Sequence, residues 1–375
     1  MSVWQTIYSE NSMNEKTVDS RKHLTDASED LGMEEVIRNK INSKYSLIDI
    51  SFSYNCLLKC RHCMFNCTPH DSRTRLNKEK IYKYIDSALE VDKFKEYAFG
   101  EQEIFFDIRS FIAAAEYLNK KVKNPSITTS TSSFWVKSYE YAREQLSQLQ
   151  KLGLNGILLS IDDFHLEFVD IEKILNCTKA SLDLGIDVSL QTIISKGSRR
   201  KIDFMKYFQR KIPHQNVYEL DWIEHNFTPV GRGAFIDESL RLYENNPLIG
   251  DCSILEIISI TPEGQVIPCC GSGSVAKYLS IGNIEEKSLS EIIKEVEVNP
   301  FINSLFVWLG PYGLIKMLEY YGKSLSLSKR HTGVCHACYE IFSNRDIYSF
   351  LAEKLNDRII EFFTTRWFIE KKYSN

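Results

Sequence analysis

The chain of 375 residues is 43% hydrophobic and 26% charged, and it carries a formal net charge of −4. This balance is typical of a globular protein and gives no reason to expect a nucleic acid or an anionic membrane as partner. No stretch of about 18 apolar residues occurs, so no bilayer-spanning helix is expected. The N-terminus lacks the apolar core of a secretory signal. We therefore expect a cytoplasmic protein whose ten cysteines bind metal or react as thiols rather than form disulfides.

Residues 1–44 are polar and weakly periodic, which predicts a loosely attached extension with one short helix around 34–41. From residue 45 onward, short apolar runs alternate with amphipathic segments of helical period. Strands are predicted at 46–53, 96–100, 126–131, 156–161, 187–194 and 217–227. Helices are predicted between them around 78–91, 108–118, 142–152 and 171–182. Repeated strand–helix alternation implies right-handed βαβ units, so the sequence predicts an α/β fold with a curved, open, parallel sheet.

The alternation ends after "TPVGRG" at 228–233. The segment that follows lacks a clear period but contains cysteines, so we expect a small domain held by metal as much as by a hydrophobic core. Within it, "TPEG" at 261–264 predicts the turn of a β-hairpin. The tail has apolar residues near helical spacing, which predicts a terminal helix docked on the core. The predicted units are therefore 1–44, 45–235, 236–345 and 346–375.

The cysteines are unevenly distributed, and the densest group is "CLLKCRHCMFNC" at 56–67. Cys56, Cys60 and Cys63 directly follow the first predicted strand, and ligands of open parallel sheets bind beyond the carboxyl ends of the strands. Thiolates select zinc or iron–sulfur clusters. A structural zinc would take Cys67 as its fourth ligand, whereas a cluster with three protein thiolates would leave one iron open. Counting ligands does not decide between them. Cys177 stands alone in a helical pattern, which predicts a core position.

Polar residues follow the next three predicted strands at their carboxyl ends. They are Gly100 and Glu101, the hydroxyl run Thr128–Thr131, and Asp162, Asp163 and His165 in "SIDDFH". Because these ends meet at one edge of a parallel sheet, the side chains are expected to form one ligand pocket facing the cysteine loop. A structural zinc knuckle does not need such a pocket.

Together these features resemble the radical S-adenosylmethionine (SAM) enzymes, whose C-x3-C-x2-C loop follows the first strand of a partial (β/α)6 barrel. The resemblance covers residues 45–235 and implies that Cys56, Cys60 and Cys63 hold a [4Fe–4S] cluster. In that family the methionyl amine and carboxylate of SAM chelate the fourth iron. Reduction then cleaves the sulfonium to a 5′-deoxyadenosyl radical that abstracts hydrogen. Cys67 is accordingly expected not to be a ligand, since a fourth thiolate would block that iron.

The segment "FGEQ" at 99–102 resembles the Gly-Gly-Glu motif of this family, with Phe99 in place of the first glycine. By this resemblance Gly100 allows close backbone approach and Glu101 accepts hydrogen bonds from the methionyl amine. His62 stands where the family has an aromatic residue before the last cysteine.

Roles at the other strand ends stay open between function and structure. Thr129 and Ser130 are expected either to contact the ribose or methionyl carboxylate of SAM or to cap the sheet. Asp162, Asp163 and His165 are expected to bind cofactor, to orient a substrate backbone, or to cap their strand. Arg232 is expected to touch adenine or a carboxylate, or to stabilise a loop through ion pairing.

A second group of cysteines lies far downstream. It comprises Cys252 and Cys269 on either side of the predicted hairpin, and Cys335 and Cys338 in "CHAC". Four such thiolates are enough to close a tetrahedral site. The pattern resembles the SPASM and twitch modules appended to radical SAM enzymes, which implies one auxiliary [4Fe–4S] cluster on these four residues. Zinc at the same residues is the alternative.

Cys270 adjoins one of these ligands and is surplus to them. It is either a spare or buried thiol, or a hydrogen-atom donor kept protonated by apolar surroundings. "CRHCMFNCTP", "SIDDFH", the "PCC" doublet and "CHACYEIFSN" resemble radical SAM epimerases that convert L- to D-residues in ribosomally made peptides. That resemblance implies hydrogen abstraction at a peptide Cα and hydrogen return by Cys270 from the opposite face.

The same resemblance implies a ribosomally synthesised precursor peptide as substrate and an electron donor such as flavodoxin or ferredoxin. Two other interpretations remain. The near one is a radical maturase that forms thioether or carbon–carbon crosslinks on a peptide, with Cys270 only structural. The distant one is a non-catalytic protein with two structural zinc sites.

Overall fold

The structure is a computed structural model that describes residues 45–357 apart from 101–102, 214–215, 246–251, 253–256, 304, 306–308 and 324–326. Three predictions lie outside the described residues: the N-terminal extension with its short helix, Glu101, and the end of the C-terminal tail. Among the described residues no helix is both long and apolar enough to cross a membrane.

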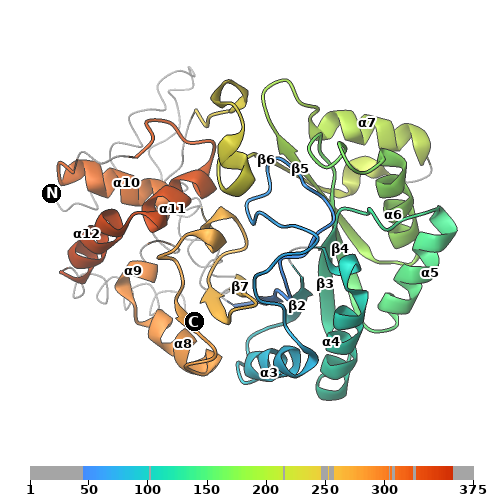
Figure 1. The fold of residues 1–375 in the computed structure, drawn as a ribbon, viewed down its shortest axis with the longest axis horizontal. Helices are drawn as coiled ribbons and strands as arrows, with labels where there is room; N and C mark the ends of the chain where they lie inside the picture. Colours follow the sequence, from blue (N-terminus) through green and yellow to red (C-terminus); the bar gives the residue numbers. More distant parts are fainter. Residues whose placement is uncertain are drawn as a thin grey trace, which may run out of the picture.

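The first half of the described chain is the predicted parallel sheet. Six strands pair in parallel and in chain order: β1 (Leu47–Ile50), β2 (Glu96–Phe99), β3 (Ser126–Thr131), β4 (Leu154–Ser160), β5 (Asp187–Ile194) and β6 (Asp221–Asn226). The helices between them are α3 (Lys78–Leu89), α4 (Ile108–Lys121), α5 (Tyr139–Gln150), α6 (Ile171–Asp183) and α7 (Lys201–Lys211). Helices α4 to α7 lie along the outer side of the sheet (Figure 1). The predicted partial (β/α)6 barrel is confirmed.

Local sequence explains these elements. Helix α3 begins where the Asn77 side chain accepts a hydrogen bond from the Lys80 amide, and it buries Ile81, Ile85 and Ala88 on one face. After α5 the chain turns at Gly153, whose φ of +100° favours glycine. Cys177 is fully buried in α6, in agreement with its predicted core position.

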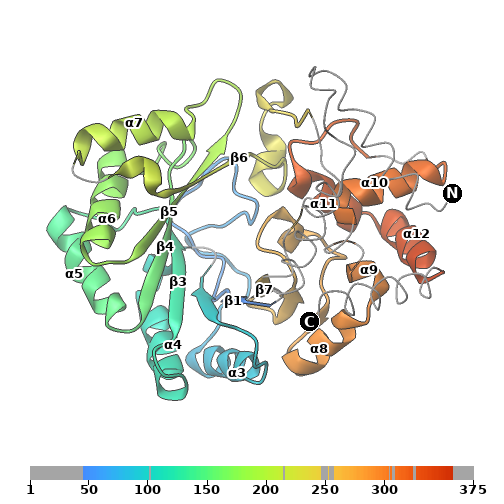
Figure 2. The same cartoon turned by 180° about the vertical axis from the view of Figure 1, so that it is seen from behind.

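The sheet does not end with the barrel strands. Strand β7 (Ile257–Ile260) pairs in parallel with β1, and β8 (Gln265–Ile267) and β9 (Gly282–Asn283) follow in antiparallel. One nine-stranded sheet results, in the order β6-β5-β4-β3-β2-β1-β7-β8-β9. The predicted hairpin at 261–264 is confirmed between β7 and β8. The C-terminal half is therefore an extension of the main sheet; β7 lies between the two halves in both views (Figures 1 and 2).

The prediction of an irregular segment up to residue 345 is wrong. It contains α8 (Leu289–Glu297), α9 (Pro300–Asn303), α10 (Gly310–Tyr320) and α11 (Val334–Ser343). Ser288 and Glu291 form a capping box at the start of α8. Apolar residues from these helices belong to the same hydrophobic cluster as the barrel core. Hydrophobic packing, as well as any metal, therefore holds this half together.

The tail begins with α12 (Arg345–Asn356), which buries Ile347, Leu351 and Leu355 against the core. The predicted docked helix is confirmed over this range. Five short 3-10 turns complete the described elements and lie at Ile104–Phe106, Val217–Glu219, Gly231–Phe235, Glu238–Leu240 and Ser272–Val275.

Candidate active site between the two cysteine groups

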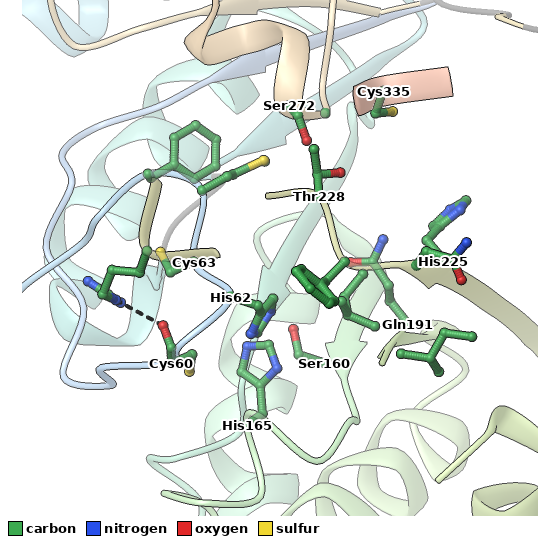
Figure 3. A pocket seen from close by; sticks show the side chains of 18 of the residues that line it. Cys60, His62, Cys63, Ser160, His165, Gln191, His225, Thr228, Ser272 and Cys335 are labelled. Atoms are coloured by element: carbon green, nitrogen blue, oxygen red, sulfur yellow. Dashed lines mark hydrogen bonds between the residues drawn. The ribbon is translucent and has the colours of Figure 1, made fainter. Parts of the chain in front are cut away.

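A cavity of about 710 Å³ lies between the barrel and the C-terminal half. The cysteine loop forms one wall, the carboxyl ends of β3 to β6 form another, and Cys270, Ser272 and Cys335 form a third. Figure 3 shows Cys60 and Cys63 on one side of this space, with Ser272 and Cys335 on another. The structure thus brings cysteines of the first group onto one cavity with Cys270 and Cys335, which lie 203 or more residues further along the chain.

The first three cysteines fit a shared cluster. Cys56, Cys60 and Cys63 all line the cavity, and the Cys63 amide donates to the Cys60 carbonyl at 3.2 Å. Burial raises the pKa of Cys56 to about 12, and the neighbouring Cys60 and Cys63 add to the shift. Crowded, desolvated thiols are unfavourable as thiolates unless a cation compensates them. A metal centre held by these three sulfurs would supply that compensation.

Cys67 lies at the end of the same loop, and its thiol contacts a neighbouring cysteine. Its thiol forms a hydrogen bond to Cys63, which lowers the pKa of Cys63 and raises that of Cys67. The Cys67 side chain is buried. The next residue, Thr68, closes the loop, because its carbonyl accepts a hydrogen bond from the Cys56 amide at 3.2 Å. It remains a prediction that the Cys67 thiol keeps its proton and does not bind the metal.

A clamp from the segment after β6 holds the cysteine loop. The Arg232 side chain donates to the Cys60 carbonyl at 2.9 Å and to the Cys67 carbonyl at 2.8 Å, while its amide donates to the Cys63 carbonyl at 3.0 Å. Of the roles expected for Arg232, loop stabilisation is the one these contacts support, although it acts through carbonyl hydrogen bonds rather than ion pairs. Gly231 lies directly against this loop with a φ of +58°.

Replacing Gly231 by alanine is expected to loosen the loop and release its iron. An added Cβ would lie 2.6 Å from the Cys63 carbonyl oxygen and closer still to that of Met64. We expect a loss of at least about 2 kcal/mol in the free energy of unfolding, since strained backbone and overlap add up. Thermal unfolding and iron analysis of the reconstituted protein would measure both effects.

Gly185→Ala is the matched control, because its φ is also positive, at +70°, but nothing lies within 4 Å of the added Cβ. This variant should lose some stability and keep its iron. Equal iron in Gly231→Ala and the control would contradict the clamp.

Only part of the predicted strand-end set reaches the cavity. Ser130 lines it and donates to the Gly100 carbonyl at 3.3 Å. Thr129 is buried and donates to the Phe99 carbonyl at 2.8 Å, which joins β3 to β2. Gly100 has a φ of +80°, and a Cβ there would collide with Ile104, so the chain requires glycine at this turn.

Glu103 is a cavity residue that the sequence analysis missed. Its carboxylate accepts from the Thr131 hydroxyl at 2.7 Å and from the Ser132 amide and hydroxyl at 2.8 and 2.7 Å. Burial raises its pKa, while these donors oppose the rise. Its charge is also felt at Cys56. Glu103 therefore fixes the end of β3 against the turn after β2 and places a carboxyl group beside the cysteine loop.

Asp162 is not among the residues that line the cavity; His165 is. The Asp162 carboxylate is 1% exposed and accepts from the His165 amide and from Nδ1 of its ring, both at 2.9 Å. Burial alone would raise the pKa of Asp162, but the charges of His165 and His62 lower it to about 2. Asp163 instead pairs with Arg199 at 2.6 Å. The two adjacent aspartates thus have separate partners.

The second group of cysteines also converges. Cys269 is close enough to Cys252, Cys335 and Cys338 for their charges to add to the rise that burial causes in its pKa. A Cβ on Gly273 would lie 2.9 Å from the Cys269 sulfur and 3.5 Å from that of Cys338. Cys338, on α11, also has a raised pKa because it is buried. Four converging buried or half-buried sulfurs suit a metal centre better than free thiols.

Cys270 lies next to this group but faces the cavity. It is exposed, whereas Cys269 is 1% exposed. Cys270 is therefore not a buried thiol, because it lines the space shared with the cysteine loop.

Comparisons with known proteins match two separate parts of the chain, each of which contains one of the cysteine groups. Residues 50–198 match the model of the radical SAM superfamily, and residues 252–339 match SPASM, an iron–sulfur cluster-binding domain. Radical SAM domains bind a [4Fe–4S] cluster and SAM, and SPASM domains bind auxiliary iron–sulfur clusters. The second match favours iron–sulfur over zinc at the downstream cysteines.

One curated relative is YydG of Bacillus subtilis (strain 168), named for a provisional role in peptide biosynthesis. It is 26% identical over 150 residues, which span 40% of this chain and 46% of that protein. The match thus covers less than half the length of the relative.

Solved structures with a similar fold include Streptococcus suis SuiB bound to S-adenosylmethionine, at 15% identity and a TM-score of 0.47 over 80% of this chain and 79% of that one. Another is anSMEcpe with bound AdoMet, at 12% identity and a TM-score of 0.49 over 84% and 99%. With the two domain matches and the two converging cysteine groups, the chain carries a radical SAM domain over residues 50–198 and a SPASM iron–sulfur domain over residues 252–339.

Proposed function

We propose that the protein is a radical SAM peptide epimerase, which converts L- to D-residues in a ribosomally synthesised peptide. The observation that carries this proposal is the position of Cys270, whose side chain lines the same cavity as Cys56, Cys60 and Cys63 but on another wall. The similarity to a relative named for peptide biosynthesis supports a peptide as the substrate.

Inversion at a carbon requires hydrogen to leave one face and to return on the other. When bound, the N-terminal cluster and SAM supply a carbon-centred radical that takes the hydrogen atom of a peptide Cα–H bond. Cys56, Cys60 and Cys63 would hold that cluster, and the clamp through Arg232 orients their loop toward the cavity. A peptide between the walls would then expose its opposite face to Cys270.

The return step uses the thiol of Cys270. Its S–H bond breaks, the hydrogen atom joins the planar Cα, and the sulfur keeps the unpaired electron. One electron and one proton restore the thiol. We propose that the electron comes from a flavodoxin- or ferredoxin-type donor. The residues Cys252, Cys269, Cys335 and Cys338, which adjoin Cys270 in the chain or converge beside it, would hold a centre that could supply one-electron chemistry there. Such a system fits the reducing cytoplasm that the cysteine content predicts.

Solvent deuterium tests the reaction. The reconstituted protein, SAM and a reductant are incubated in D2O with synthetic copies of the short peptides encoded beside its gene. Epimerisation predicts one deuterium at a peptide Cα, because the thiol exchanges with solvent, and a D-residue after hydrolysis. A loss of two hydrogens would instead show crosslinking. Bound zinc in place of iron, with no absorbance near 400 nm, would contradict any radical function.

A further inference from the structure

His165 lies beside the first cysteine group, and Asp162 holds it in place. Asp162 accepts from its backbone amide and from ring Nδ1, and also from the Ile193 amide at 3.4 Å. The His165 side chain is 16% exposed and Asp162 is 1% exposed, so water competes little with these bonds. Both the position and the rotation of the imidazole are therefore fixed.

Aromatic contacts restrict the same group further. The ring of His62 meets that of His165 edge-on, with 4.9 Å between the ring centroids. It also packs against the ring of Phe164, with 4.7 Å between the centroids. Figure 3 shows the two histidines facing each other beside Cys60. His62 belongs to the cysteine loop and His165 follows β4, so this contact joins the loop to the sheet.

The His165 side chain also forms a hydrogen bond to the Cys60 thiol, and both residues line the cavity. Since Nδ1 is engaged by Asp162, Nε2 is the ring nitrogen left for sulfur. Hydrogen bonds to ligand sulfurs stabilise the reduced, more negative state of an iron–sulfur cluster and so raise its reduction potential. The contacts thus run in the order Asp162, His165, Cys60, from a buried carboxylate to an expected ligand sulfur.

We propose that Asp162 and His165 form a relay that sets the reduction potential of the N-terminal cluster through a hydrogen bond to Cys60. The proposal rests on Cys60 being a cluster ligand, but not on the identity of the substrate. It gives Asp162 a positioning role, through His165, in place of direct contact with cofactor. The electron concerned is the single one that reduces the cluster and is delivered by a flavodoxin- or ferredoxin-type donor.

Redox titration followed by electron paramagnetic resonance (EPR) tests the relay on the full-length reconstituted protein. The signal that changes on addition of SAM identifies the N-terminal cluster. His165→Phe keeps a ring of similar shape but removes the hydrogen bond. At a fixed potential, we expect about a tenfold fall in the ratio of reduced to oxidised cluster, which corresponds to about 59 mV for a one-electron couple. Asp162→Asn should shift the ratio in the same direction, since the ring loses its anionic partner.

Asp163→Asn is the matched control, because Asp163 is the adjacent carboxylate and pairs with Arg199 instead. It should leave the midpoint potential unchanged. Should His165→Phe fail to retain iron, Asp162→Asn with full iron carries the test alone. An unchanged midpoint in every iron-replete His165 or Asp162 variant would overturn the relay. Because no peptide is present, these results are independent of whether the reaction is epimerisation.

Discussion

Cys270→Ala is expected to form no D-residues, while it still cleaves SAM and removes hydrogen from the peptide. The change deletes the only reacting atom proposed on that wall of the cavity and leaves the cysteine loop untouched. Because the side chain is exposed to the cavity, no core packing is lost and the variant should fold normally. The measurement combines 5′-deoxyadenosine release with chiral amino-acid analysis of the peptide.

Cys177→Ala is the control for this prediction. Cys177 is fully buried in α6 and is not among the residues lining the cavity, so its loss should reduce stability by about 1 kcal/mol and leave D-residue formation intact. Full epimerisation by Cys270→Ala would refute the assignment of the hydrogen donor. Crosslinked product in both variants would point to the alternative maturase.

The second large effect concerns the cysteine loop. Replacing Cys56, Cys60 and Cys63 together by alanine should remove about half of the iron, because one of two four-iron clusters is lost, and should abolish release of 5′-deoxyadenosine. Cys67→Ala should keep its iron and still release 5′-deoxyadenosine, since Cys67 forms a hydrogen bond to Cys63 and is predicted not to be a ligand. Iron, sulfide and 5′-deoxyadenosine would be measured in the triple variant and in Cys67→Ala. Loss of iron in Cys67→Ala equal to that of the triple variant would make Cys67 a ligand.

Much of the barrel could be predicted from sequence because its signals are local. Strands such as 187–194 alternate polar with apolar residues, and the apolar residues of helices such as 171–182 repeat every three to four positions. The grouping of Cys56, Cys60 and Cys63 is likewise local. The sequence therefore predicts the fold class, the loop and the edge of the sheet where the cavity lies, although only part of the expected side chains reaches that cavity.

What could not be predicted depends on contacts between distant segments. The pairing of β7 with β1 joins residues about 210 positions apart, as Leu47 with Ile257 shows, and no local period reveals it. Glu103 was missed because its role depends on donors from Thr131 and Ser132 across the sheet. Asp162 lies at the predicted strand end, but its carboxylate turns under His165, which only side-chain geometry discloses.

The proposed radical chemistry requires that one iron of the N-terminal cluster has no protein thiolate and binds SAM directly. Electron–nuclear double resonance on the reduced protein, with 17O in the methionyl carboxylate of SAM, measures that bond. We predict a hyperfine coupling between the labelled oxygen and the cluster in wild type and in Cys67→Ala. Absence of coupling from an iron-replete cluster, together with no 5′-deoxyadenosine under strong reductant, would contradict it.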